Sequence, residues 1–366
     1  MILERFCQER NLNPNTRIGY QQTIRQFENT TNLTIDEMIQ ISKDERNKEW
    51  EETQLYYWLI TYRNQVYNRY KEQTAELYLK RVKAVFRHNH IIIHDLPYFS
   101  TKQTRKSEEI DYEDLPDREM LKKCIEAKSP LLKAITLFIS SSGFSKIDTL
   151  DLTIRTYLES TYEYHHSDDI YKAIRLMDKV DVVPTFKLQR KKTGETYRTF
   201  ASPEAIRAIN IYLESREDHL TPDSKVFLVS ESYLNDLFQM TNDKLGFGRV
   251  NDRRRYSPQM LRIYQASQLA EAGMNDSLID LIQGRKPQSI ARRHYIRVKR
   301  EKLRSEYIRC LPFLVVEDIN QVKSELELTK DELERTSMEN IELRDNLRDI
   351  YSRLELLEKL KPKKEE

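Results

Sequence analysis

Glycine is scarce in this chain, which has seven glycines among 366 residues. Glycine is the residue that most readily adopts the left-handed backbone of turns and helix ends. Long stretches of the sequence also place apolar residues three and four positions apart, which is the spacing of an amphipathic helix. We therefore expect a mainly helical protein in which each glycine marks a particular stop or turn.

The length and the charge of the chain indicate its broad organisation. A chain of 366 residues is long enough for two compact domains and an appendage. Charged residues make up 33% of the chain, and acidic and basic residues nearly balance to a net charge of +2. A net charge this small does not by itself indicate a polyanionic partner. Residues 317–366 carry 15 acidic and 10 basic side chains, so the rest of the chain is modestly basic.

The cysteines and the apolar segments of the sequence indicate the cellular compartment in which the protein works. Cys7, Cys124 and Cys310 are far apart and odd in number, which fits neither a disulfide framework nor a metal site with paired ligands. The first residues lack the apolar stretch of a signal peptide, and no segment approaches about 18 apolar residues. We expect reduced thiols in a cytoplasmic protein that has no membrane partner.

Residues 1–96 are expected to form a small helical bundle. Asn13 supplies an N-cap before a first-turn proline, and Thr34 begins a capping-box pattern for a second, shorter helix. Two longer amphipathic helices follow before the pattern ends. Residues 97–116 are polar and cationic and have no apolar period, which is typical of a linker.

Residues 117–311 are expected to form a second domain, mainly helical with a small β-sheet. Residues 182–200 are rich in strand-forming side chains around a Lys-Thr-Gly-Glu turn, the pattern of a β-hairpin. Three capped helices follow, and we expect Gly273 and Gly284 to end the last two. The predicted class is α+β.

Residues 317–361 are expected to form a coiled coil, followed by a charged tail at 362–366. Apolar residues recur there at alternating steps of three and four, which is a heptad seam. The polar positions of the seam are Thr329, Thr336 and Asn340. A helix folded back on the second domain is the alternative, and the narrow apolar seam with its charged flanks favours the coiled coil over it. The apolar seam residues are Ile319, Val322, Leu326, Leu333, Leu343, Leu347, Ile350, Leu354 and Leu357.

The sequence contains four blocks in which cationic, hydroxyl and glycine residues gather. It has no phosphate-binding glycine loop, HExxH pair, GxSxG elbow or dense acidic cluster, so the signatures of nucleotide hydrolysis, zinc proteolysis and metal-dependent nucleases are missing. The blocks lie at 142–148, 192–194, 257–262 and 284–295.

In their order and approximate spacing the four blocks resemble the tyrosine recombinases, and they are most similar to archaeal members of the phage-integrase type. The resemblance covers about residues 10–310. It implies a helical, SAM-like core DNA-binding domain at 1–96 and a catalytic domain at 117–311, which close as a clamp around double-stranded DNA. It also implies cleavage without a metal or ATP cofactor, and a tetramer assembled on DNA.

The resemblance assigns roles to individual positions. Tyr295 is the nucleophile that forms a 3′-phosphotyrosyl link, Arg262 is a phosphate-clamping arginine, and Lys192 protonates the leaving 5′ oxygen. Asp148 supports the first block, and Arg285 stands where the family commonly has a histidine. Guanidinium groups suit this chemistry because their fork binds phosphate oxygens bidentately while charge develops on them.

Three positions depart from the family pattern, and one of them is Arg285, a cationic replacement that could still donate to phosphate. Ser145 stands where the family has its first phosphate-clamping arginine, and Gln259 stands where it has a histidine. Other cations could compensate or bind DNA phosphates, and their positions cannot be derived from the sequence. These are Lys146, Arg253, Arg254, Arg255, Arg292 and Arg293.

The expected function is therefore site-specific recombination of DNA, for a mobile element or provirus, by a homo-oligomer to which the coiled coil adds a contact. A catalytically impaired DNA-binding protein that retains the fold is the alternative, because two positions of the catalytic set are substituted. A purely structural coiled-coil protein is a third hypothesis, and it predicts no salt-dependent affinity for DNA.

Overall fold

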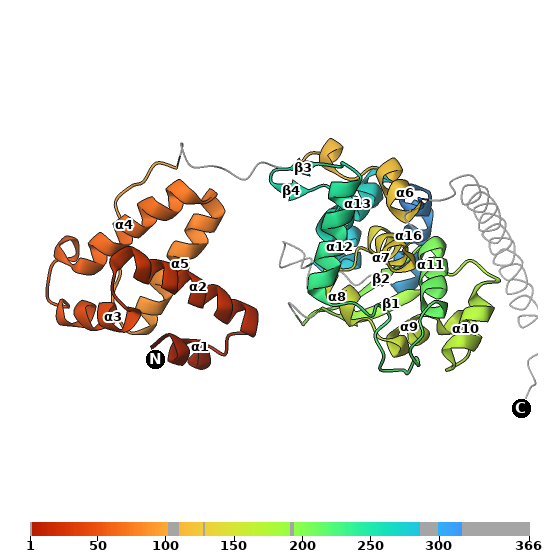
Figure 1. The fold of residues 1–366 in the computed structure, drawn as a ribbon, viewed down its shortest axis with the longest axis horizontal. Coiled ribbons are helices and arrows are strands. Elements are labelled where there is room, and N and C mark those ends of the chain that lie inside the picture. Colours follow the sequence, from red (N-terminus) through yellow and green to blue (C-terminus); the bar gives the residue numbers. More distant parts are fainter. Residues whose placement is uncertain (1, 102–109, 127–128, 191–193, 286–298, 317–366) are drawn as a thin grey trace, which may run out of the picture. The chain divides into compact units, whose positions relative to one another are not determined.

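The computed structural model describes residues 2–101, 110–126, 129–190, 194–285 and 299–316, and Figure 1 shows their helices and strands. Several sequence predictions lie outside the described residues. They concern the coiled coil at 317–361, the charged tail at 362–366, and the side chains of Lys192, Arg292, Arg293 and Tyr295.

The chain divides into two compact units, Met1–Glu109 and Ile110–Glu366. Both are built mainly from helices, and the second also contains two short antiparallel strand pairs. The prediction of a mainly α protein with a small β-sheet is confirmed. Among the described residues, no helix combines the length and the apolar character that crossing a bilayer requires.

The first unit is a helical bundle whose starts follow the capping pattern of the sequence. The side chain of Asn13 accepts a hydrogen bond from the amide of Thr16, and Thr34 with Glu37 forms a complete capping box, as expected. Helix α1 was not foreseen. The helices are α1 (Ile2–Glu9), α2 (Pro14–Thr31), α3 (Ile35–Asp44), α4 (Gln54–Arg69) and α5 (Glu72–His88), with a 3-10 turn at Trp50–Glu52.

The core of the first unit lies between the helices. Phe27 of α2 is fully buried, and its ring packs edge-on against Tyr62 of α4 and Phe86 of α5. Edge-to-face aromatic pairs of this kind add specific geometry to apolar burial. The three longest helices are thereby held together by aromatic side chains.

The second unit is organised around a central apolar helix, α7 (Pro130–Ser142), which packs against α6, α11 and α13. Ten of its thirteen residues are buried. The elements of this unit are α6 (Arg118–Glu126), α8 (Lys146–Asp151), α9 (Ile154–Thr161), α10 (Ile170–Met177), α11 (Pro203–Glu214), α12 (Glu231–Lys244), α13 (Pro258–Glu271), α14 (Asp276–Ile282) and α16 (Arg300–Leu314), with 3-10 turns at Tyr112–Asp114 and Tyr162–Tyr164.

The strands form two separate hairpins. The expected one pairs β1 (Thr185–Gln189) with β2 (Thr196–Phe200) in antiparallel register. A second, unforeseen hairpin pairs β3 (Arg249–Val250) with β4 (Arg253–Arg254). Its turn residues Asn251 and Asp252 both have positive φ, a conformation that these two residue types tolerate better than most.

Glycines end two helices of the second unit, as predicted. Gly284 has a φ of +62°, its amide donates to the carbonyl of Leu281, and the amide of Arg285 donates to the carbonyl of Asp280. This pair of bonds defines a Schellman motif, which satisfies carbonyl groups at a helix end. Gly273 closes α13 with the same pattern.

Candidate functional site

A buried arginine stands at the centre of the second unit. The Ser257 hydroxyl caps α13 and Pro258 occupies its first turn, so Arg262 lies in the second turn. Its side chain is only 5% exposed, and its guanidinium donates to the carbonyls of Gly143 and Gln283. One side chain therefore joins the end of α7, the middle of α13 and the end of α14.

Arg262 keeps its charge despite its burial. Desolvation is the main cause that lowers the pKa of its guanidinium to about 10; Arg190 and Arg285 also lower this pKa, and Tyr197 and Asp148 raise it. A pKa near 10 still leaves the group protonated at neutral pH. The site is a fixed positive charge in a poorly solvated environment.

Two buried glutamines hold the loops that surround Arg262. The Gln283 side-chain nitrogen Nε2 donates to the Arg262 main-chain carbonyl at 2.9 Å and to the Gln265 side-chain oxygen at 2.6 Å. Gly143 has a φ of +65°, and a Cβ there would lie 2.6 Å from that same Gln265 oxygen. Glycine is thus required at 143 both by backbone conformation and by the close approach of Gln265.

Asp148 lies beside this centre and is held by two hydroxyl groups. The Ser145 hydroxyl donates to the Asp148 carboxylate at 2.7 Å and accepts from the Asp148 amide at 3.2 Å, so Ser145 is the N-cap of α8. Tyr197 of β2 donates to the same carboxylate at 3.4 Å. Burial and the neighbouring Asp148 raise the pKa of the Tyr197 phenol, which therefore stays a neutral donor.

The end of α14 gathers further cations. The Arg190 guanidinium donates to the carbonyl of Gly284 at 3.0 Å, next in the chain to the Gln283 carbonyl that receives Arg262. Arg285 follows directly and is exposed. Arg190 and Arg285 therefore both lie close enough to lower the pKa of Arg262, and Asp148 is the carboxylate that raises it.

Other predicted cations are engaged elsewhere. Lys146 pairs with Glu231 at 2.7 Å and with Asn235 at 3.0 Å, which ties it to α12. Arg254 forms a bidentate pair with Asp243, and Arg255 donates to backbone carbonyls of residues 113–115. None of these contacts is directed at Arg262.

Gln259 and Arg253 are exposed side chains. Gln259 lies three residues before Arg262, a spacing that places the two on the same face of α13. Arg253 lies on β4. The predicted set is thus divided: Arg262, Asp148 and Arg285 come together, with Ser145 beside Asp148, whereas Lys146, Arg254 and Arg255 point to other partners.

The sequence reasoning overlooked three supporting side chains: Arg190, Tyr197 and Gln283. Arg190 belongs to a cationic triplet whose members are equivalent in the sequence, and only the hairpin register orients it. The Glu195 carbonyl accepts a hydrogen bond from the Arg190 amide at 2.8 Å, which joins the two sides of the hairpin just beyond β1 and β2.

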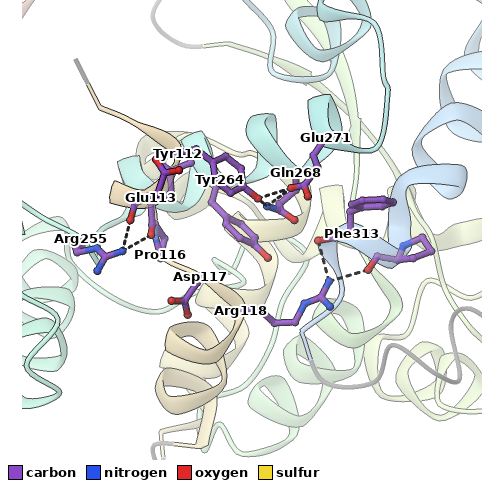
Figure 2. Close-up of a pocket in the computed structure, with 12 residues that line it drawn as sticks. Tyr112, Glu113, Pro116, Asp117, Arg118, Arg255, Tyr264, Gln268, Glu271 and Phe313 are labelled. Atoms are coloured by element: carbon purple, nitrogen blue, oxygen red, sulfur yellow. Dashed lines mark hydrogen bonds between the residues drawn. The ribbon is translucent and has the colours of Figure 1, made fainter.

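A cavity of about 740 Å³ lies away from this centre, between the segment at 112–118, α13 and the end of α16. Figure 2 shows Tyr112, Gln268 and Glu271 joined by hydrogen bonds, and Arg118 directed at backbone carbonyls of α16. Arg118 is thus occupied by α16 carbonyls and Arg255 by the carbonyls of residues 113–115. The residues that line the cavity include neither Arg262 nor Asp148. We therefore place the candidate site at Arg262.

A family model matches part of the second unit. The family model described as archaeal phage integrase matches residues 227–308, which contain Gln259, Arg262, Arg285 and Tyr295. No curated protein sequence matches the chain.

Solved structures resemble the chain in fold. The Tn1549 transposon integrase in complex with circular intermediate DNA has 14% sequence identity and a TM-score of 0.53, covering 83% of this chain and 97% of that one. A second complex of that integrase gives a TM-score of 0.52 at 14% identity, covering 84% and 98%. The match to the XerA recombinase covers 84% of this chain and 97% of that one, with 17% identity and a TM-score of 0.36. The chain has the fold of the tyrosine recombinases and matches the archaeal phage integrase family over residues 227–308.

Proposed function

We propose that this protein is a site-specific DNA recombinase of the integrase type, which cuts and rejoins double-stranded DNA for a mobile element or provirus. The match of residues 227–308 to archaeal phage integrases carries the proposal, because it includes the buried Arg262. The two Tn1549 integrase structures named above are complexes with DNA, and they support DNA as the substrate.

The proposed reaction uses Tyr295 as the nucleophile. Its hydroxyl oxygen attacks the scissile phosphorus and releases its proton to water. The bond from phosphorus to the 5′ oxygen breaks, and Lys192 gives that oxygen a proton. A 3′-phosphotyrosyl link remains, and a 5′ hydroxyl of another strand reverses the step. Covalent catalysis of this kind divides one difficult displacement into two easier ones.

Arg262 supplies electrostatic stabilisation in this scheme. Its guanidinium is already desolvated and fixed by the Gly143 and Gln283 carbonyls, so it need not reorganise when charge develops on the phosphate. Preorganised donors of this kind are worth about 10²–10³ in rate each. Asp148 positions the first block through Ser145 and Tyr197, and Arg285 adds an exposed donor beside it.

We also propose a separate role for each part of the chain. The helical residues 1–96 serve as the core DNA-binding domain, residues 117–311 as the catalytic domain, and 317–361 as a contact between protomers of a tetramer on DNA.

A trapping assay tests the proposed reaction. The full chain is mixed with a pool of duplexes that carry random sequences and a nick. After cleavage, the short fragment that bears the new 5′ hydroxyl diffuses away and the protein stays attached to the remaining DNA. Covalent adducts are separated under denaturing conditions and their DNA is sequenced. We expect adducts with one recurring sequence for the wild type and none for Tyr295→Phe.

A catalytically impaired DNA-binding protein is the second candidate, and one observation favours it. Ser145 caps α8 at the position of the family's first arginine, so this side chain brings no charge to the site. This candidate predicts normal, salt-dependent DNA binding by both the wild type and Tyr295→Phe, with no covalent adduct from either.

A further inference from the structure

We propose that Arg190 is a phosphate-binding residue and takes over the charge missing at Ser145. This inference rests on the proposed function and deepens it, because it names a second guanidinium for the DNA phosphodiester at the same site. Three observations support it: the role of Ser145, the placement of Arg190 and the charge balance around Arg262.

Ser145 is committed to the protein fold. Its hydroxyl both accepts from the Asp148 amide and donates to the Asp148 carboxylate. The nearest cation in the sequence, Lys146, is held by Glu231 and Asn235 on α12. The first block therefore brings a carboxylate toward the site and no cation, so a second positive group has to come from another element.

Arg190 comes from the hairpin and is fixed at both ends. Its backbone amide donates to Glu195 and its carbonyl accepts from the Gly194 amide, each at 2.8 Å, so the base of the turn is closed. Its guanidinium donates to the Gly284 carbonyl at 3.0 Å. Arg262 donates to the preceding carbonyl, that of Gln283, so the two guanidinium groups bind consecutive peptide units of one helix end.

This arrangement leaves positive charge in excess. Arg190 and Arg285 both lower the pKa of Arg262, which is the effect of nearby positive charge, whereas Tyr197 and Asp148 raise it. Adjacent guanidinium groups are costly unless an anion binds between them. Arg190 is also only partly buried, so part of its surface is open to a ligand. A phosphodiester, with two non-bridging oxygens, fits this pair chemically.

Inorganic orthovanadate tests the anion site without a DNA sequence, by calorimetric titration of the full chain. We expect Arg190→Ala to weaken vanadate binding about tenfold or more, as loss of a charge-assisted hydrogen bond would. Arg190→Gln keeps a donor for the Gly284 carbonyl but removes the charge, so it should lose affinity to a similar extent. Arg190→Lys should lie between these variants and the wild type.

Arg198→Ala is the matched control, because Arg198 is an exposed arginine on the partner strand of the same hairpin, opposite Lys187. It should bind vanadate like the wild type. Circular dichroism melting verifies that each variant is folded. The proposal is overturned if Arg190→Gln binds as well as Arg198→Ala, or if the wild type binds no vanadate.

The trapping assay separates this inference from the proposed function. Vanadate binding that depends on Arg190, without any covalent DNA adduct, would refute the recombinase reaction and leave the anion site standing. Adducts that form equally fast in Arg190→Gln and Arg198→Ala would refute the role of Arg190 and leave the reaction standing.

Discussion

Replacing Gly143 by alanine should destabilise the second unit, and the structure separates two contributions. The φ of +65° is a left-handed conformation that costs an alanine about 1–2 kcal/mol. The new Cβ would also lie 2.6 Å from the Gln265 side-chain oxygen and 3.2 Å from the Gln283 amide nitrogen. Displacing these buried groups loses at least one hydrogen bond, about 1–3 kcal/mol more. We expect a total loss of about 2–5 kcal/mol in the free energy of unfolding.

Gly273→Ala isolates the first contribution. Gly273 also ends a helix with a left-handed backbone, at φ +79°, but a Cβ there would meet nothing within 4 Å. It should therefore lose only about 1–2 kcal/mol. The difference between the two variants measures the close approach of Gln265.

Urea denaturation of the full chain gives both values. Far-ultraviolet circular dichroism follows helices of both units, whereas tryptophan fluorescence reports the first unit, because the two tryptophans are Trp50 and Trp58. The Gly143→Ala change should shift the dichroism transition and leave the fluorescence transition in place. Equal losses for Gly143→Ala and Gly273→Ala would refute the steric argument.

Three further predictions concern capping, catalysis and thiol reactivity. Ser145→Ala should lower the free energy of unfolding by about 0.5–2 kcal/mol in urea denaturation, because α8 loses its N-cap; no loss would show that the cap is unimportant. Arg262→Lys should reduce the rate of covalent adduct formation by about 10²–10³ in the trapping assay, since a lysine cannot reproduce the guanidinium fork; an unchanged rate would contradict the assigned role. Burial raises the pKa of all three cysteine thiols, that of Cys124 to about 12, so a thiol reagent at pH 8 should react far more slowly with the native chain than with the denatured one; equal rates would contradict the buried placement.

The coiled-coil hypothesis also has a direct test. Removal of residues 317–361 should lower the oligomeric mass measured by light scattering. An unchanged mass would favour the alternative of a helix folded back on the second domain.

Features that depend on near neighbours in the sequence could be predicted from it. The caps at Asn13 and Thr34 and the helix ends at Gly273 and Gly284 are each set by a few consecutive residues. The β3–β4 hairpin escaped notice because its strands are too short to show an alternating pattern, although Asn-Asp is a recognisable turn signal.

Features that depend on distant residues could not be predicted. Sequence similarity singled out Arg262, but its two acceptors lie on separate elements, 119 and 21 positions away. The pairing of Lys146 with α12 and the contact of Arg190 with Gly284, 94 positions apart, arise only from tertiary packing. The capping role of Ser145 was readable, since a serine three residues before an aspartate resembles a capping pattern, but the family comparison directed attention to the missing arginine instead.

The guanidinium of Arg262 is anchored to main-chain oxygens, and every residue type carries such an oxygen. A point mutation can remove a carboxylate partner outright, whereas at Gly143 or Gln283 it can only move the acceptor. These hydrogen bonds of Arg262 should therefore tolerate substitution of most surrounding side chains. They should be lost chiefly through substitutions that change the backbone conformation. Random mutagenesis scored for loss of anion binding should accordingly yield its damaging substitutions at Arg262 and Arg190 themselves and at the glycines of these two helix ends.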